Sequence, residues 1–380
     1  MGNTFGKIFK VTTAGESYSG YFQDEKKGGL ITIIEGVPAG IEITVDKINE
    51  ELDKRRTSTS FVTTARSEKD KPIIFSGVME NNLTTGAPIG ILVRNTDITE
   101  EQVNKHKTLK DVIRPGHANY TYYKKYGEHM DYLGGGRASG RETVSRVIAG
   151  AVAKIILDKM GIDVIAYTVE SHGIKASHIT YEKARENYRK NIINCPDLEK
   201  AEEMIEDLKS VKEKNDSAGG VIEIIAKGVK PGIGEPVFDK IDATIAYALM
   251  SIGGVKGVEF GEGFNHSKML GTQSNDIPYT NGNDILFKTN NAGGVLGGIT
   301  NGEEIRVRVA VKPTPTVLVI QDTVNMKTLE EEKVQFSTKN DVSICPRIYP
   351  VCEAMVRIAI LDAILQNKAL NQKEKGRAFF

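Results

Sequence analysis

The 380-residue chain has no net charge, no long apolar run and few cysteines. Its 50 lysines and arginines balance 50 aspartates and glutamates, which argues against a nucleic-acid-binding protein because such proteins usually carry a basic excess. No apolar run of about 18 residues occurs, so we expect no transmembrane helix. The N-terminal residues also lack the apolar core of a signal peptide, and we expect a cytoplasmic protein.

The cysteines are Cys195, Cys345 and Cys352, and their number is odd and their spacing follows no known pattern. This argues against both a disulfide scaffold and a four-cysteine zinc site. We expect all of them to behave as small buried apolar residues in a reducing compartment, and we expect no metal site.

Several motifs of common enzymes are also missing. The sequence contains no P-loop, no HExxH zinc motif and no GxSxG nucleophile motif. What stands out instead is residues 287–316, which hold five glycines before an alternating run and the exit KPTPT. Such a loop can bring its backbone close to a flat or anionic ligand, so we expect a ligand site there, with a long surface turn as the alternative.

The hydrophobic pattern predicts an α+β fold with mainly antiparallel strands. Predicted strands are Leu30–Gly36, Pro72–Val78, Ile89–Asn95, Asp163–Thr168, Val221–Val229 and Ile305–Val311. Predicted helices are Val45–Arg56, a buried helix from Ser139 to Gly161, charged helices within 181–214, and Asp239–Ile252 and Pro350–Gln366. We expect one domain over residues 1–380, with 367–380 as a loose tail.

Local signals define some helix ends. Thr44 is expected to be an N-cap, and Ser139 and Glu142 have the spacing of a capping box. Gly161 is expected to end its helix in the left-handed conformation, and Pro196 is suited to the first turn of a helix.

A triple glycine, 134–136, precedes the helix expected from Ser139, with Arg137 and Arg141 beside it. Free N–H groups, a helix dipole and two guanidinium groups together predict an anion site. His117 lies in a Pro-Gly turn and is a candidate general acid, although a single histidine is more often a structural residue. Asp341 could act as a base or could simply form a turn.

Ordered segments along the whole chain resemble the chorismate synthase family. The segments that carry the resemblance are GNTFGKIFKVTTAGES, EGVPAGI, LDKRR, TGAPIGILVRNTD, RPGHANYTYYKKYG, GGGRASGRET, GIGEPVFDKIDATIAYALMSIGGVKGVEFGEGF, NNAGGVLGGITNGE, KPTPT and PRIYPVCEAM.

The resemblance implies a β-α-β sandwich, in which a helical core is flanked by antiparallel sheets, and a homotetramer. It implies conversion of 5-enolpyruvylshikimate-3-phosphate to chorismate and phosphate, an anti-1,4-elimination in the shikimate pathway that leads to aromatic amino acids. The reaction has no net redox change but needs reduced FMN, which lends electron density transiently. NADPH is a candidate reductant of the flavin.

The family's functional residues can be carried over one by one. His117 matches the histidine that protonates the reduced flavin, Asp341 matches the aspartate that helps to remove the substrate proton, and Tyr18 occupies the position of a second catalytic histidine. The implied cofactor-binding residues are Arg55, Arg137, Ala138, Ser139, Gly253, Gly254, Gly297, Lys312, Pro313, Thr314, Pro315, Thr316 and Lys339.

The sequence also departs from the family. GESHG is GESYS here, and a tyrosine titrates near about 10, so Tyr18 is a poorer acid for the leaving phosphate than histidine. RHDP has become Lys339-Asn340-Asp341-Val342, which replaces a bidentate guanidinium by an ammonium group. Further family arginines are replaced by Phe61, Met130 and Leu133.

These departures leave alternatives to a chorismate synthase-type lyase. One is a paralog that keeps the fold and flavin site but acts on another, less anionic cyclohexene substrate. The other is a flavin-binding or assembly protein without catalysis.

Overall fold

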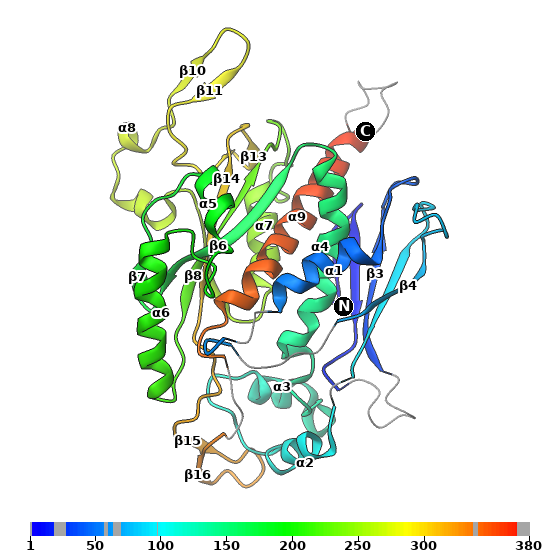
Figure 1. The fold of residues 1–380 in the computed structure, drawn as a ribbon, viewed down its shortest axis with the longest axis vertical. Coiled ribbons are helices and arrows are strands. Elements are labelled where there is room, and N and C mark those ends of the chain that lie inside the picture. Colours follow the sequence, from blue (N-terminus) through cyan, green and yellow to red (C-terminus); the bar gives the residue numbers. More distant parts are fainter. Residues whose placement is uncertain are drawn as a thin grey trace.

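A computed structural model of the chain describes residues 2–18, 28–56, 60–63, 70–96, 98–336 and 341–370. Within these residues a layer of helices lies between two antiparallel sheets (Figure 1). The α+β class and the β-α-β sandwich are therefore confirmed. Lys339, Asn340 and residues 371–380 lie outside the described residues.

The first sheet contains five strands among the described residues, all paired antiparallel. In spatial order they are β1 (Thr4–Phe5), β2 (Lys10–Ala14), β3 (Gly29–Glu35), β5 (Ile89–Arg94) and β4 (Pro72–Ser76).

The second sheet also has five described strands and is antiparallel throughout. In spatial order they are β7 (Ile174–Lys175), β6 (Asp163–Ser171), β8 (Gly220–Lys227), β14 (Ile305–Val311) and β9 (Val255–Phe260). Buried and less buried residues alternate along β14, which confirms its predicted bounds and orientation.

The layer between the sheets is formed by helices from both halves of the chain. They are α1 (Val45–Arg55), α4 (Thr143–Asp158), α7 (Ile241–Met250) and α9 (Cys345–Leu370). Other described helices lie outside this layer. They are α2 (Glu100–Thr108), α3 (Asn119–Tyr126), α5 (Tyr181–Asn187), α6 (Leu198–Glu213) and α8 (Gly271–Ser274).

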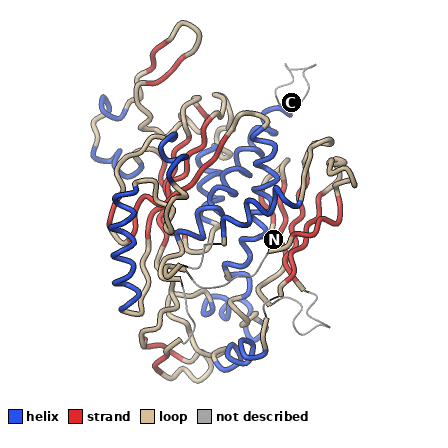
Figure 2. Tube along the Cα trace, in the orientation of Figure 1, coloured by secondary structure: helices blue, strands red, loops and turns tan. Residues whose placement is uncertain are grey.

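Three hairpins complete the described strands. They are β10 (Pro278–Thr280) with β11 (Ile285–Phe287), β12 (Val295–Leu296) with β13 (Ile299–Thr300), and β15 (Gln321–Val324) with β16 (Glu331–Val334). The β10–β11 hairpin projects from one end of the molecule, whereas the opposite end, around α2 and α3, consists largely of loops and short helices (Figure 2).

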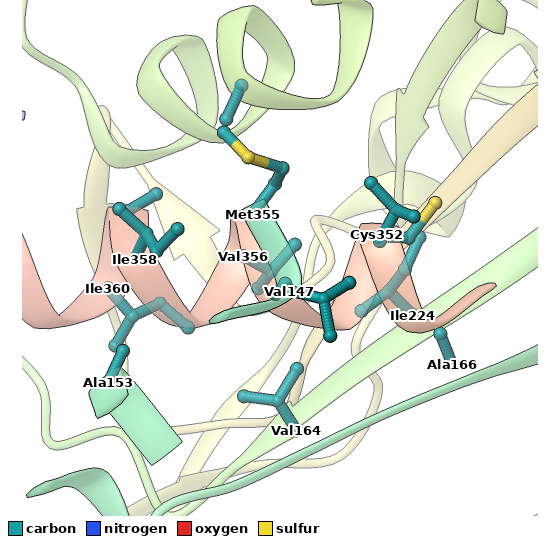
Figure 3. Close-up of a cluster of buried hydrophobic side chains, with 14 of the residues drawn as sticks. Val147, Ala153, Val164, Ala166, Ile224, Cys352, Met355, Val356, Ile358 and Ile360 are labelled. Atoms are coloured by element: carbon teal, nitrogen blue, oxygen red, sulfur yellow. The ribbon is translucent and has the colours of Figure 1, made fainter. Parts of the chain in front are cut away.

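The core is continuous from sheet to sheet through α4 and α9. Met355, Val356 and Ile358 on α9 belong to one buried cluster with Val147 on α4 and Ile224 on β8 (Figure 3). Among the described helices, none is long and apolar enough to cross a membrane.

A group of four buried charges lies inside this layer. Lys54 pairs with Glu51 at 2.9 Å and with Glu353 at 3.0 Å, and Arg357 pairs with the same two carboxylates at 2.7 and 3.0 Å. Their side chains are at most 8% exposed, so each charge depends on the others for compensation. The group fixes the end of α1 against α9.

Of the two helix starts predicted from capping residues, one is confirmed and the other is wrong. Thr44 caps α1 as expected, because its side chain accepts a hydrogen bond from the N–H of Lys47. The capping box at Ser139 is wrong: the Ser139 hydroxyl accepts from the N–H of Arg141, and Glu142 instead pairs with Arg146. A short 3-10 turn therefore precedes α4, which begins at Thr143.

Other predicted ends also shift. Gly161 has the expected positive φ of 72°, but Pro196 precedes α6, whose N-cap is Asp197. Helix α9 begins at Cys345, not at Pro350, and continues to Leu370 into the predicted tail. A proline inside a helix costs about 3 kcal/mol, and burial of both Pro350 and its neighbours on α9 offsets this cost.

Candidate active site

A cleft of about 600 Å³ opens at the loop-rich end of the molecule. Its walls come from the ends of α1 and β2, from α2 and α3, from the glycine-rich segment before α4, and from the start of α9. Elements from the whole length of the chain therefore meet here, as expected for a binding site placed at the edge of a rigid scaffold.

Two arginines share one carboxylate on one side of the cleft. Arg55 places Nη1 3.0 Å from Oδ2 of Asp70, and Arg141 pairs with the other oxygen of the same carboxylate. Arg55 also donates to the hydroxyl of Thr143 at 3.0 Å. Burial lowers the pKa of Arg55 to about 10, so it stays charged at neutral pH. Two cations against one anion leave an excess positive charge facing the cleft.

Arg347, in the first turns of α9, adds a further cation. Its Nε lies 3.3 Å from Oδ1 of Asp341, and both residues line the cleft. The predicted base, Asp341, therefore lines the cleft next to a guanidinium group.

His117 lies in a turn that cations surround. The N–H of Asn119 donates to its Nδ1 at 3.2 Å, and Nη2 of Arg114 lies 2.8 and 2.7 Å from the two ring nitrogens. Burial, Arg114 and Lys312 together lower the pKa of His117 to about 3. The imidazole is therefore neutral in the empty cleft, and its predicted role as an acid requires an anion to compensate these cations.

Glycines form one wall of the cleft. Gly134 and Gly135 have φ values of 59° and 92°. A Cβ on Gly134 would lie 2.4 Å from the ring of Tyr18, and a Cβ on Gly135 would lie 3.2 Å from the ring of His117. Glycine at these positions lets both rings approach the main chain closely.

The structure brings together many of the predicted site residues. Those that line the cleft are Tyr18, Arg55, His117, Ala138, Ser139, Gly253, Thr314, Thr316 and Asp341. Their individual roles stay predictions. Lys339, which was predicted beside Asp341, lies outside the described residues.

Other predicted residues lie behind the cleft wall. Lys312 donates to the carbonyl of Gly116 at 2.6 Å, and its own N–H donates to the carbonyl of Gly254 at 2.9 Å. Pro313 and Pro315 flank the lining residue Thr314. These residues shape the wall, whereas their own side chains do not line the cleft.

Arg137 likewise lies behind the cleft wall. Its guanidinium donates to the carbonyl of Gly15 at 2.8 Å and to the hydroxyl of Thr13 at 3.0 Å. These bonds tie the segment before α4 to the end of β2, which leads directly to Tyr18.

Gly297 does not line this cleft. It lies in the β12–β13 turn, where the neighbouring Gly298 accepts a hydrogen bond from the N–H of Ile241. This turn is near the Ile305 end of β14, whereas Lys312 follows the other end, about 20 Å away along the strand.

Two of the substituted family positions are not among the residues that line the cleft. Phe61 packs beside a buried cluster with the ammonium of Lys212 5.6 Å from its ring, and Leu133 belongs to a buried cluster with Tyr18. Met130 does line the cleft. Loss of arginine at Phe61 and Leu133 therefore removes no cation from the cleft walls seen here.

Sequence reasoning missed several lining residues. Lys105, His106 and Lys110 face the cleft from α2 and the residues after it, and Asp70 and Arg347 were not assigned. The basic run KHKTLK at 105–110 was a visible signal for the first group. Nothing in the sequence marked Asp70, because its importance comes from two arginines distant along the chain.

Comparison with known proteins agrees with this geometry. The family model described as chorismate synthase matches residues 9–365. The chain is 63% identical over 373 residues to a chorismate synthase of Acetivibrio thermocellus, which covers 96% of this chain and 95% of that protein. It is 45% identical over 366 residues to a chorismate synthase of Methanococcoides burtonii, covering 96% of each.

A solved structure supports the same assignment. A crystal structure of chorismate synthase superposes with a TM-score of 0.72 at 31% identity and covers 95% of this chain and 93% of that one. The family model, the relatives and the fold agree over nearly the whole length, so the chain belongs to the chorismate synthase family.

Proposed function

We propose that this protein is a carbon–oxygen lyase that converts 5-enolpyruvylshikimate-3-phosphate to chorismate and phosphate with reduced FMN. Similarity over the full length to chorismate synthases supports this reaction over a paralog with another substrate and over a non-catalytic flavin-binding protein.

The observation that carries the proposal is the number of cations around one cleft. Those that line it are Arg55, Arg56, Lys105, Lys110, Arg114, Arg141 and Arg347. The proposed substrate carries two carboxylates and a phosphate, and each charge-assisted contact contributes about 1.5–3 kcal/mol. The described residues therefore keep enough positive charge to hold such a substrate despite the altered family motifs.

The residues present also fit a flavin. The hydroxyl Oγ1 of Thr314 is buried without a hydrogen-bond partner and lines the cleft. A Cβ on Gly253 or Gly140 would meet no atom within 4 Å, so both backbones leave open space that a flat ring can fill. When bound, reduced FMN supplies the electron density that eases loss of phosphate.

The protein's own residues then bind, orient and move protons. Arg55 and Arg141, fixed by Asp70, present a preorganised positive charge to an anionic group. His117 holds a proton beside the glycine wall once an anion offsets Arg114. Asp341, which lies beside Arg347, accepts the proton that the substrate loses.

A homotetramer in the cytoplasm is part of the proposal. Large apolar side chains are exposed on the described part of the chain, among them Phe238 at 93%, Phe264 at 81% and Ile285 at 71%. Apolar groups left in water favour association between copies. The described cysteines are buried free thiols, which suits a reducing compartment. Light scattering on the purified protein measures the oligomeric state.

One anaerobic experiment tests the reaction. The purified protein is mixed with the substrate and FMN, with and without dithionite, and chorismate is followed by its absorbance. We expect product only with reduced FMN. Absence of product while FMN remains bound would exclude the proposed reaction. Replacing dithionite by NADPH shows whether the protein reduces its own flavin.

A further inference from the structure

One wall of the cleft carries an imidazole that the reaction as described above does not use. His106 lines the cleft from the last turn of α2, and its ring meets the ring of Tyr18 edge-on at a centroid distance of 5.3 Å. Figure 1 shows α2 at the loop-rich end of the molecule, below α3.

Helix α2 holds this ring in place. A capping box of Thr99 and Gln102 fixes its start, and Val103, 1% exposed, is buried in a small cluster with Leu133. His106 is therefore presented by an anchored helix and not by a loose loop, as a group that must meet a reacting atom requires.

An uncompensated cation lies on the same wall. Arg114 has no ion pair with any carboxylate in the described ranges, although burial lowers its pKa to about 10. Lys105 and Lys110 line the cleft beside it. A partly buried guanidinium without a carboxylate partner is a preformed site for an anion with several oxygens, such as phosphate.

The other titratable groups on this wall are poorer proton donors. Tyr18 carries a phenol, which is by nature a weaker acid than an imidazolium group. Burial raises the pKa of Asp131. Its carboxylate, however, accepts a hydrogen bond from the N–H of Leu133, which favours the charged form and opposes this rise. His117 is enclosed by Arg114 and by the turn that Lys312 anchors.

We propose that His106 is the catalytic acid that protonates the departing phosphate, with Arg114 binding that phosphate. This rests on the function proposed above. The carbon–oxygen bond breaks with its electron pair passing to the phosphate oxygen, and the imidazolium N–H of His106 gives its proton to that oxygen. The carbon that gives its proton to Asp341 supplies an electron pair for a new double bond. The existing ring double bond then shifts toward the carbon that loses the phosphate, so charge and atoms balance.

The protonation of His106 is coupled to binding. Burial, Arg114 and Lys105 lower the pKa of His106 to about 4, so the ring is neutral in the empty cleft at pH 7. Tyr18, Lys110 and Asp131 are further titratable groups that line the cleft. A phosphate dianion placed between Arg114 and His106 compensates the cations, and the ring takes up a proton.

Calorimetry with inorganic phosphate tests this coupling without turnover. Binding is measured at pH 7 in buffers that differ in ionisation enthalpy, which gives the number of protons taken up. We expect uptake in the unaltered protein and a reduced uptake in His106→Gln, in which His117 beside Arg114 still gains a proton. We expect no change in His178→Gln, an exposed histidine outside the cleft. Unchanged uptake in His106→Gln, or its loss only in His117→Gln, overturns the proposal.

Kinetics of the reaction give the second test. General acids contribute about 100- to 10,000-fold, so kcat of His106→Gln falls by about 100-fold or more while FMN binding is kept. Adding Tyr18→His to that variant places a new imidazole on the same wall and restores at least about 10-fold. If the unaltered protein makes no chorismate, the function fails; if it does and His106→Gln is equally fast, only the role of His106 fails.

Discussion

The ammonium group of Lys312 donates a hydrogen bond to the carbonyl oxygen of Gly116 over 2.6 Å, although 196 residues separate them in sequence. Gly116 immediately precedes His117, and a Cβ on Gly116 would lie 3.2 Å from Pro315. The segment after β14 thereby fixes the turn that places the imidazole in the cleft.

Removal of this hydrogen bond should slow catalysis. We expect Lys312→Met to lower kcat/KM by about 10- to 100-fold, because small displacements of a reacting group have effects of this size. Lys312→Arg keeps a donor and should recover part of the loss. Steady-state kinetics with reduced FMN measure both variants, and equal rates in Lys312→Met and the unaltered protein would show that the turn needs no anchor.

The two neutral imidazoles predict a loss of stability in acid. The folded-state pKa values of His117 and His106, about 3 and about 4, lie below the ordinary value of 6.5. At a pH between the folded-state and ordinary values, the unfolded chain therefore binds more protons than the folded protein. The free energy of unfolding therefore falls as the pH is lowered from about 6.5 toward 4. Urea unfolding at several pH values measures the slope, which should become smaller in a His106→Gln, His117→Gln double variant.

The helix crossing in the core should not accept a methyl group. A Cβ on Gly150 of α4 would lie 2.3 Å from Cβ and 2.5 Å from Cα of Ala354 on α9. We expect Gly150→Ala to destabilise the protein by about 1–3 kcal/mol. Gly271→Ala is the matched control, because its Cβ would meet nothing within 4 Å and alanine is the better helix former. Denaturant unfolding should separate the two variants in opposite directions.

The buried charges should be strongly interdependent. Burial raises the pKa of Glu51, but Arg357 and Lys54 outweigh this and hold it at about 2. Arg357→Met leaves two buried carboxylates with one ammonium group and should cost about 3–5 kcal/mol. Lys333→Met breaks an exposed pair with Asp322 and should leave the urea midpoint nearly unchanged. Equal midpoints in urea for both variants would contradict this account.

The open space above Gly253 predicts a selective loss of cofactor. Because a Cβ there meets no protein atom within 4 Å, Gly253→Leu should fold normally and yet fill part of the cleft. We expect its Kd for FMN to rise by at least about 10-fold. Fluorescence titration measures binding, and Gly271→Leu serves as the control at an open site outside the cleft.

Sequence patterns were sufficient where a local signal sets the structure. Strand β14 and the start of α1 follow from alternation and from the cap of Thr44, which depend only on neighbours along the chain. The glycines at 134–136 and the turn at His117 likewise marked the cleft before its shape was known. The resemblance to a family supplied the order of the layers and the roles of individual residues.

Long-range contacts were decided only by the tertiary structure. Pro350 remains inside α9 because burial of the helix between two sheets outweighs a missing backbone hydrogen bond. Helix propensities of neighbouring residues do not include the free energy of this burial. Asp70 became important because Arg55 and Arg141 converge on it, and Gly297 was separated from Lys312 by the length of β14. A sequence determines which groups are available, but the charges and shapes that they meet depend on folding.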